Sequence, residues 1–399
     1  MKRLKRKIIG ITLIIFLLLT NYLSAFGQSK YSGPNMDSVE ISLLTCGPRP
    51  DVYSLYGHTA LRYHDKSSGT DLAVNYGMFS FGKPFFVLRF VFGLTDYEMA
   101  IEYFSDFVAH YASTGCGIRQ QTLNLTASEK AAIAEAIGEN YEPQNRVYRY
   151  NYFYDNCTTR ARNIILSHTH GTVEYHNKNS RGEISFREMI HQYNETHRWA
   201  RFGNDLLLGM KADLPTTHDQ QQFLPENLSA DFSRAVLKSA DGNRKLVGSE
   251  SWVLPRTRDV GSDSFPLSPT VCLGLFALMV MAVTVVERVK QANYWLFDAV
   301  IMTADGLCGL ILLAMVFSQH PTVSLNFQIL LLNPLTIFLL VPTLKAMRKR
   351  RANLWLKAWT TCIVIFLFCG IFQSYAEGMY FVALSLLIRN ISKILQFKK

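Results

Sequence analysis

Apolar and polar positions alternate in several short stretches near the start of the chain. Residues 38–44, 58–64 and 72–78 each show the period of two that is typical of half-buried strands. Residues 65–71 (DKSSGTD) join the last two and have the composition of a hairpin loop. Residues 117–125 are strand-like as well. These patterns predict a sheet that includes a hairpin.

Helical periodicity occurs between and after these strands. Residues 96–113 space their apolar positions helically, and residues 126–129 (TASE) form a capping box that opens a second helix to about residue 140. Strand-like residues 146–154 follow, and Cys157 then starts another apolar-periodic stretch. The order of elements predicts a mixed α+β domain.

The chain changes character beyond about residue 200, where prolines become frequent. Residues 239–264 have the composition of an extended linker. Residues 202–209 (FGNDLLLG) are compatible with a membrane-proximal apolar contact or with ordinary core, and we favour core.

Five apolar stretches fill the C-terminal third, each near the ~20 residues that a bilayer requires. They are residues 268–286, 297–318, 327–344, 356–376 and 379–395. Lys and Arg lie after the first and third stretches and in the tail, whereas the other two loops contain none. The positive-inside rule therefore places the C-terminus in the cytoplasm. Arg389 and Lys393 fall inside the last stretch, so they either snorkel to the cytoplasmic interface or the helix lies in that interface.

The N-terminus predicts export. Residues 1–7 are basic, residues 8–19 are apolar, and residues 25–27 provide a small-x-small site, as in a cleavable signal peptide. An uncleaved anchor is the alternative. We expect a signal peptide at 1–27, a periplasmic catalytic domain at 28–238, a linker at 239–264 and a transmembrane domain of five helices at 265–399.

The net charge of +10 over 399 residues first suggests a nucleic-acid or anionic partner. Its distribution removes that interpretation, because residues 1–28 carry +5, residues 29–264 carry −3 and residues 265–399 carry +8. The positive charge lies in the most apolar segments, which is typical of membrane proteins and not of nucleic-acid binders.

Cys157 has the most informative setting of the seven cysteines. Asp155 and Asn156 are good N-caps, so Cys157 lies in the first turn of a helix, where unpaired N–H groups and the helix dipole lower the thiol pKa from about 8.5 toward neutrality. The other exported cysteines, Cys46 and Cys116, either pair or stay buried. The remaining four lie in apolar stretches and are expected to be packing residues.

A thiolate also needs a base, and His58 at the start of a predicted strand is the candidate. Asn75 or Tyr76 on the facing strand would orient its imidazole. A strand histidine opposite a helix-start cysteine is a papain-type arrangement, here with the histidine first in the chain. A purely structural role for both residues is the alternative. No spacing of histidines and acids suggests a metal site.

At these residues the sequence resembles the permuted NlpC-like thiol superfamily. More closely, it resembles the Lnb family of bacterial lipoprotein N-acyltransferases, in which an exported catalytic domain precedes a short helical membrane domain. The motifs that carry the resemblance are YGHTALR at 56–62, NYG at 75–77, NLT at 124–126, FYDNCTTR at 153–160, DLLLG at 205–209 and NPL at 333–335.

The resemblance implies an α+β permuted papain-like (NlpC-like) periplasmic domain followed by an all-α domain of about five transmembrane helices in the inner membrane. It implies Cys157 as nucleophile and His58 as base, with Asn75 as our choice of third member. We further expect Asn156 and Tyr56 to contact substrate and Arg160 or Arg62 to lie near a lipid phosphate.

The implied reaction moves an acyl chain from a phospholipid, through a Cys157 thioester, to the α-amino group of a diacylated lipoprotein. No cofactor, metal or nucleic acid is expected. A cell-wall endopeptidase, a phospholipase, or a non-catalytic membrane assembly protein remain as alternatives.

Overall fold

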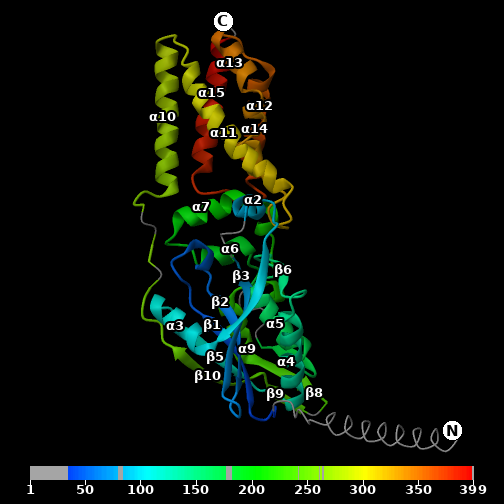
Figure 1. The fold of residues 1–399 in the computed structure, drawn as a ribbon. Coiled ribbons are helices and arrows are strands. Elements are labelled where there is room, and N and C mark those ends of the chain that lie inside the picture. Colours follow the sequence, from blue (N-terminus) through cyan, green and yellow to red (C-terminus); the bar gives the residue numbers. More distant parts are fainter. Residues whose placement is uncertain are drawn as a thin grey trace, which may run out of the picture.

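The computed structural model describes residues 35–79, 84–176, 182–240, 242–259, 261–262 and 265–397. The expected signal peptide at 1–27 lies outside these residues. The described chain forms a sheet domain (residues 39–254) and a helical domain (residues 269–396), which lie one above the other in Figure 1.

The sheet domain is built on a seven-stranded antiparallel sheet with the order β10-β5-β1-β2-β3-β4-β6. The strands are β1 (Val39–Cys46), β2 (His58–Asp65), β3 (Thr70–Met78), β4 (Asp96–Tyr103), β5 (Ile118–Leu123), β6 (Val147–Arg149) and β10 (Val247–Leu254). The expected β2–β3 hairpin forms, with Ala60 opposite Asn75. This register puts Asn75 two pairs along from the start of β2, on the same face as His58.

Helices cover both faces of this sheet. On one face, α3 (Phe104–Thr114) packs Phe104, Phe107 and Tyr111 over Ala60 and Ala73. On the other face, the core is closed by α4 (Ala127–Tyr141), α5 (Cys157–Ser167) and α9 (Pro225–Arg234). The Thr126 capping box that opens α4 is present. Both α5 and β2 are therefore rigid, buried elements that can fix a site between them.

Short elements complete the sheet domain. They are η1 (Val52–Ser54), α2 (Phe86–Val91), α6 (Phe186–His191), α7 (Arg198–Leu207), η2 (Met210–Asp213), α8 (His218–Gln221) and a three-stranded sheet of β7 (Thr172–Tyr175), β8 (Ala235–Ser239) and β9 (Gly242–Lys245).

Two segments differ from expectation. Residues 96–103, predicted as helix, form β4, and only residues 104–114 are helical. Residues 247–254, predicted as linker, form β10, which pairs with β5 at the edge of the main sheet. In both, long-range strand pairing outweighs local preference.

The helical domain contains a helical segment at each of the five expected positions. They are α10 (Pro269–Val289), α11 (Trp295–Val316), the broken segment η3 (Phe327–Leu330), α12 (Leu335–Phe338) and α13 (Leu340–Arg348), then α14 (Leu354–Cys369) and α15 (Met379–Gln396). Among the described residues, α10 and α11 are long and apolar enough to cross a membrane, and the broken segment, bent by 78°, is a third candidate. Five spans remain a prediction.

The charges of α15 neither snorkel nor face an interface. Arg389 and Lys393 are buried among the helices and pair with acids of α10 and α11. Arg389 Nε bonds Asp298 Oδ1 at 2.6 Å, and Lys393 bonds Glu287. Two cations and two anions therefore neutralise each other inside the bundle.

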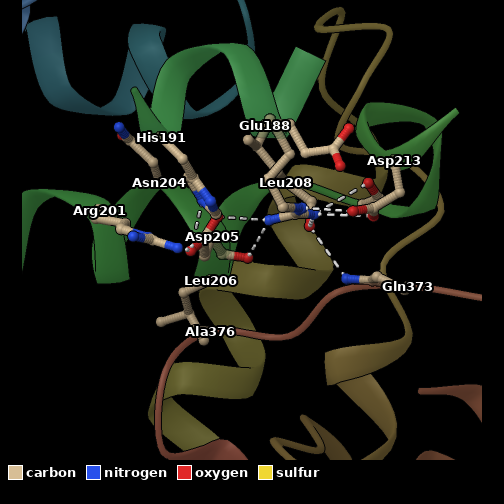
Figure 2. A network of polar contacts seen from close by, with 12 residues as sticks. Glu188, His191, Arg201, Asn204, Asp205, Leu206, Leu208, Asp213, Gln373 and Ala376 are labelled. Carbon is tan, nitrogen blue, oxygen red and sulfur yellow. Dashed lines mark hydrogen bonds and ion pairs between the residues drawn. The ribbon is translucent and has the colours of Figure 1, made fainter. Parts of the chain in front are cut away.

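The two domains meet in a polar junction around α7, shown in Figure 2. Gln328 Nε2 donates to the carbonyl of Asp205, and Gln373 Nε2 donates to that of Leu208. The N–H of Gly209 bonds the carbonyl of Thr322 at 2.9 Å, and a Cβ at Gly209 would lie 2.2 Å from the carbonyl oxygen of Leu325. The backbones thus meet too closely for any side chain at this position.

Two apolar residues of α7 also contact the helical domain. Phe202 and Leu206 pack against the core of the helical domain. Our preference for ordinary core at residues 202–209 was wrong for these two, because they make the membrane-proximal contact.

Candidate active site

Cys157 is the first residue of α5, and Asn156 caps that helix. Asn156 Oδ1 accepts from the N–H groups of Thr158 and Thr159, both at 2.9 Å. Its Nδ2 donates to the carbonyls of Tyr152 and Phe223, also at 2.9 Å. The amide is saturated and 4% exposed. Asn156 therefore holds the start of α5 in place and has no polar atom left for the substrate contact that we expected.

His58 begins β2 directly after Gly57. Gly57 has φ +78°, and a Cβ there would lie 2.7 Å from the carbonyl oxygen of Cys46. Only glycine fits this close approach. His58 Nε2 lies 3.0 Å from Asn75 Oδ1 on β3, and Asn75 Nδ2 donates to Glu102 Oε1 on β4 at 2.7 Å. The three neighbouring strands β2, β3 and β4 thus supply a continuous hydrogen-bonded series, from His58 through Asn75 to Glu102.

The imidazole of His58 is also hydrogen-bonded to the thiol of Cys157. Burial raises the pKa of Cys157, but the charge of His58, its hydrogen bond and the N–H of Thr59 outweigh burial and lower the pKa to about 7. Burial lowers the pKa of His58, but the Cys157 thiolate and the bond to Asn75 raise it above its usual value. Each charge stabilises the other, which favours a thiolate–imidazolium pair.

Small residues and tyrosines surround the pair. Gly77, with φ +82°, brings the β3 backbone close, since a Cβ there would lie 3.8 Å from Cys157 Cβ and 3.4 Å from the Tyr150 ring. Thr59 and Thr158 join β2 to α5 through a buried 3.0 Å hydrogen bond between their hydroxyls. The threonine pair fixes the distance between the strand that carries the base and the helix that carries the thiol.

This arrangement can perform nucleophilic acyl transfer, because a thiolate, a proton carrier and its orienting amide are preassembled. The helix-start amides differ from expectation. Those of Thr158 and Thr159 are already taken by Asn156. Within the described ranges, no acceptor bonds the N–H of Cys157, so it alone remains for an oxyanion.

The remaining predicted substrate contacts lie elsewhere or are engaged. Arg62 binds Asp71 through two bonds of 2.7 and 2.6 Å and also binds Gln120. Tyr56 is buried, and its hydroxyl accepts from Asn204 at 2.7 Å, a contact with α7. Neither reaches Cys157. Arg160 lies one turn after Cys157, with its guanidinium bound to Asp155 and 3.5 Å from the centre of the Tyr148 ring.

Family comparisons agree with the division seen in the fold. Residues 28–192 match the model of the Lnb N-terminal periplasmic domain, and residues 261–399 match that of the Lnb transmembrane domain. The chain belongs to the Lnb family. It is therefore a membrane protein with a periplasmic domain, of a family associated with lipoprotein processing. No curated protein and no solved structure shows significant similarity to it.

The Lnb periplasmic domain contains two further cysteines, and neither forms the disulfide that we considered. Cys46 and Cys116 are free and buried, as in our alternative. Burial raises the pKa of Cys46 far above its usual value, so this thiol stays protonated. Cys116 Sγ bonds the carbonyl of Pro48. Within the described ranges, no group of three or more His, Cys, Asp and Glu residues is placed to hold a metal ion.

Sequence reasoning missed Glu102 in this Lnb site. The residue lies in the stretch predicted as helix, where it would have had no relation to Asn75. Residues 97, 99 and 101 (Tyr, Met, Ile) also alternate with polar positions, which is the signal that favours a strand. A strand beside β3 would have placed Glu102 near the histidine's partner.

Proposed function

We propose that the chain is a lipoprotein N-acyltransferase that transfers an acyl chain from a phospholipid to the α-amino group of a diacylglyceryl-cysteine lipoprotein. The observation that carries this proposal is the paired Cys157 and His58, in a domain attached directly to membrane helices. Both proposed substrates are anchored in the same membrane by their acyl chains, so an active site tethered to that membrane can serve both.

In the first step, the Cys157 thiolate attacks the ester carbonyl of the phospholipid. The N–H of Cys157 donates to the oxyanion of the tetrahedral intermediate. When the intermediate collapses, the carbon–oxygen ester bond breaks and the imidazolium of His58 protonates the leaving alkoxide. The products are an acyl-thioester on Cys157 and a lysophospholipid, with His58 neutral.

In the second step, the α-amino group of the lipoprotein attacks the thioester. An α-amine has a pKa near ~8, so a useful fraction is unprotonated at neutral pH. Neutral His58 accepts the proton that the nitrogen loses as the amide forms. The carbon–sulfur bond breaks, which releases the triacylated lipoprotein and restores the thiolate–imidazolium pair.

The proposal is tested with the full chain in phosphatidylethanolamine vesicles that also hold a purified diacyl lipoprotein. Mass spectrometry of the lipoprotein's N-terminal peptide should show one added acyl mass, and Cys157 trapped before acceptor addition should carry an acyl-thioester. Cys157→Ser and His58→Ala should abolish the added mass at unchanged protein level. Cys46→Ser serves as the matched cysteine control and should retain it.

Other products would overturn the proposal. Free fatty acid without peptide acylation indicates a phospholipase, and cut muropeptide indicates an endopeptidase. Acylation in cells that survives both Cys157→Ser and His58→Ala indicates a non-catalytic assembly protein.

We also propose that α14 and α15 both cross the membrane, which puts the C-terminus in the cytoplasm. Exposed apolar side chains continue along both, including Ile365 and Phe368 in α14 and Leu384, Ile388 and Leu395 in α15. A C-terminal alkaline phosphatase fusion should be inactive and a C-terminal green fluorescent protein fusion fluorescent. The opposite pattern would show an even number of spans.

A further inference from the structure

A cavity of about 660 Å³ lies at the junction of the two domains. It is lined from the sheet domain by α6, α7 and the segment between them, and from the helical domain by the connection between α14 and α15. The charged residues of its wall are His191, Glu195, Arg198, Arg201, Asp205 and Glu377. None of the residues of the Cys157 site lines it, so it is a second feature that the acyl-transfer mechanism does not use.

Most of these charges are already engaged by other protein groups. Asp205 is bound by the buried Arg187 at 2.8 Å and by His191 at 2.8 Å. Glu377 is bound by Arg198 and by the hydroxyl of Thr270. These pairs shape the cavity wall and leave little charge on those residues for a ligand.

One cation and one anion are less fully engaged. Arg201 Nε makes a long ion pair of 3.9 Å with Asp205 Oδ2, and no hydrogen bond of the Arg201 guanidinium exists within the described ranges. Figure 2 shows Arg201 and His191 beside Asp205, with His191 making the close contact. Glu195 is exposed and, among the described residues, its carboxylate makes no hydrogen bond or ion pair. A ligand with one negatively and one positively charged group would complement Arg201 and Glu195.

The position of the cavity adds a second observation. Trp199 and Tyr375 lie at this level, and Trp199 Nε1 donates to the carbonyl of Leu267, just before α10 begins. Tryptophan and tyrosine gather at the depth of the lipid headgroups, where one side of the ring is apolar and the other is wet. The turn that carries Glu377 ends α14 and precedes α15 at the same level. The cavity is therefore at the height of phospholipid headgroups.

We propose that this cavity binds the headgroup of a zwitterionic phospholipid, with the phosphate on Arg201 and the ammonium on Glu195. The assignment of that lipid as acyl donor rests on the proposed function, whereas the binding site itself does not. Arg201 offers several donors in a planar fork that suits phosphate oxygens.

Binding is measured with the full chain in detergent by native mass spectrometry, using three probes of matched acyl chains. Phosphatidylethanolamine carries both charges, phosphatidylglycerol carries only the phosphate, and diacylglycerol carries neither. The wild type should bind them in that order of affinity. Arg201→Gln should lower the affinity for phosphatidylethanolamine and for phosphatidylglycerol by roughly tenfold or more, which is the size of one lost charge-assisted hydrogen bond.

The second variant separates the two charges. Glu195→Gln should lower the affinity for phosphatidylethanolamine but not that for phosphatidylglycerol. The variant should therefore lose the preference for phosphatidylethanolamine. Arg351→Gln removes an exposed arginine in the connection between α13 and α14 and should change the affinity for neither lipid. The alkylation rate of Cys157 serves as the test of folding for Arg201→Gln, and this rate should equal that of the wild type.

Three results would overturn the proposal. They are unchanged lipid binding by folded Arg201→Gln, equal binding of diacylglycerol and phosphatidylethanolamine, and displacement of the lipid by a soluble lipoprotein N-terminal peptide, which would assign the cavity to the acceptor. Lipid binding by Cys157→Ser tests this proposal in the absence of the acyl-transfer reaction. If phosphatidylethanolamine binds the cavity but the wild type acylates nothing, only the proposed function fails.

Discussion

Asn75 Nδ2 donates a 2.7 Å hydrogen bond to Glu102 Oε1, and this contact settles how the amide of Asn75 faces His58. A carboxylate only accepts, so the NH₂ group must face Glu102 and the amide oxygen must face the imidazole. His58 Nε2 must then carry a proton, so Nδ1 is the nitrogen available to exchange a proton with Cys157 in the proposed mechanism. Glu102 therefore fixes a tautomer through Asn75.

Removing Glu102 should misorient Asn75. Glu102→Ala is expected to lower kcat for acyl transfer about tenfold, the scale of one lost charge-assisted hydrogen bond. Glu102→Gln keeps an acceptor oxygen and should lose less. Asn75→Ala should lower kcat at least as much, and the double variant should be no worse than Asn75→Ala alone. Additive losses in kcat would show that Glu102 acts independently of Asn75.

The Cys157 thiolate should titrate near neutrality. Because the pKa of Cys157 is lowered to about 7, its alkylation rate by iodoacetamide should rise with pH to a half-maximum near 7. His58→Ala removes the opposing charge and leaves burial, which shifts the half-maximum above the ordinary thiol value. Cys46, whose pKa is raised, should remain unmodified at neutral pH. A midpoint unchanged in His58→Ala would contradict the ion pair.

Asn156 should matter for stability as well as activity. Asn156→Ala removes the cap of α5 and two bonds to buried carbonyls, so the free energy of unfolding should fall by about 1–3 kcal/mol. Asn145→Ala removes an exposed asparagine with a single backbone bond and should have little effect. Thermal unfolding of the two variants in the same detergent makes the comparison. Equal melting temperatures would argue against the capping role.

The junction should fail when Gly209 gains a side chain. Gly209→Ala places a Cβ against the Leu325 carbonyl and should separate the domains, which increases proteolysis between residues 209 and 269. Lipoprotein acylation should fall while alkylation of Cys157 stays unchanged. Gly203→Ala in α7 has nothing within 4 Å and is the matched control. Wild-type proteolysis of Gly209→Ala would mean that the junction tolerates displacement.

The buried charges of the helical domain should depend on one another. Arg389→Met leaves Glu287 and Asp298 with one cation, and breaking a buried pair costs about 3–5 kcal/mol. Adding Asp298→Asn restores neutrality and should recover part of the loss. Exposed Lys357→Met is the control. The melting temperature in detergent reports each change, and no recovery in the double variant would contradict mutual compensation.

The Cys157 site could be predicted because both of its motifs are local. Asn156 signals a helix cap and Gly57 signals a close approach before His58, and both features are present in the fold. The partners of Arg62 and Tyr56 could not be predicted in the same way. Gln120 and Asn204 lie 58 and 148 residues away along the chain, and nothing in the local sequence indicates such contacts.

The two errors in secondary structure have a common cause. Residues 96–103 support both an alternating and a helical reading, and pairing with β3 decides for the strand. Residues 247–254 contain Gly, Ser and Glu, which are typical of a linker, yet β5 offers an unpaired edge. Sheet edges are made by distant segments, so local composition does not reveal them.

The sheet domain is fastened to the helical domain on two sides. Its edge strand β10 leads into α10, and the carbonyls of Phe92 and of Leu206 in α7 accept hydrogen bonds from the connection that follows α11. Two separate attachments prevent the sheet domain from rotating freely about either one. Under the proposed function, this double attachment keeps Cys157 at a constant height above the membrane, so each substrate has to span the remaining distance with its own flexible segment.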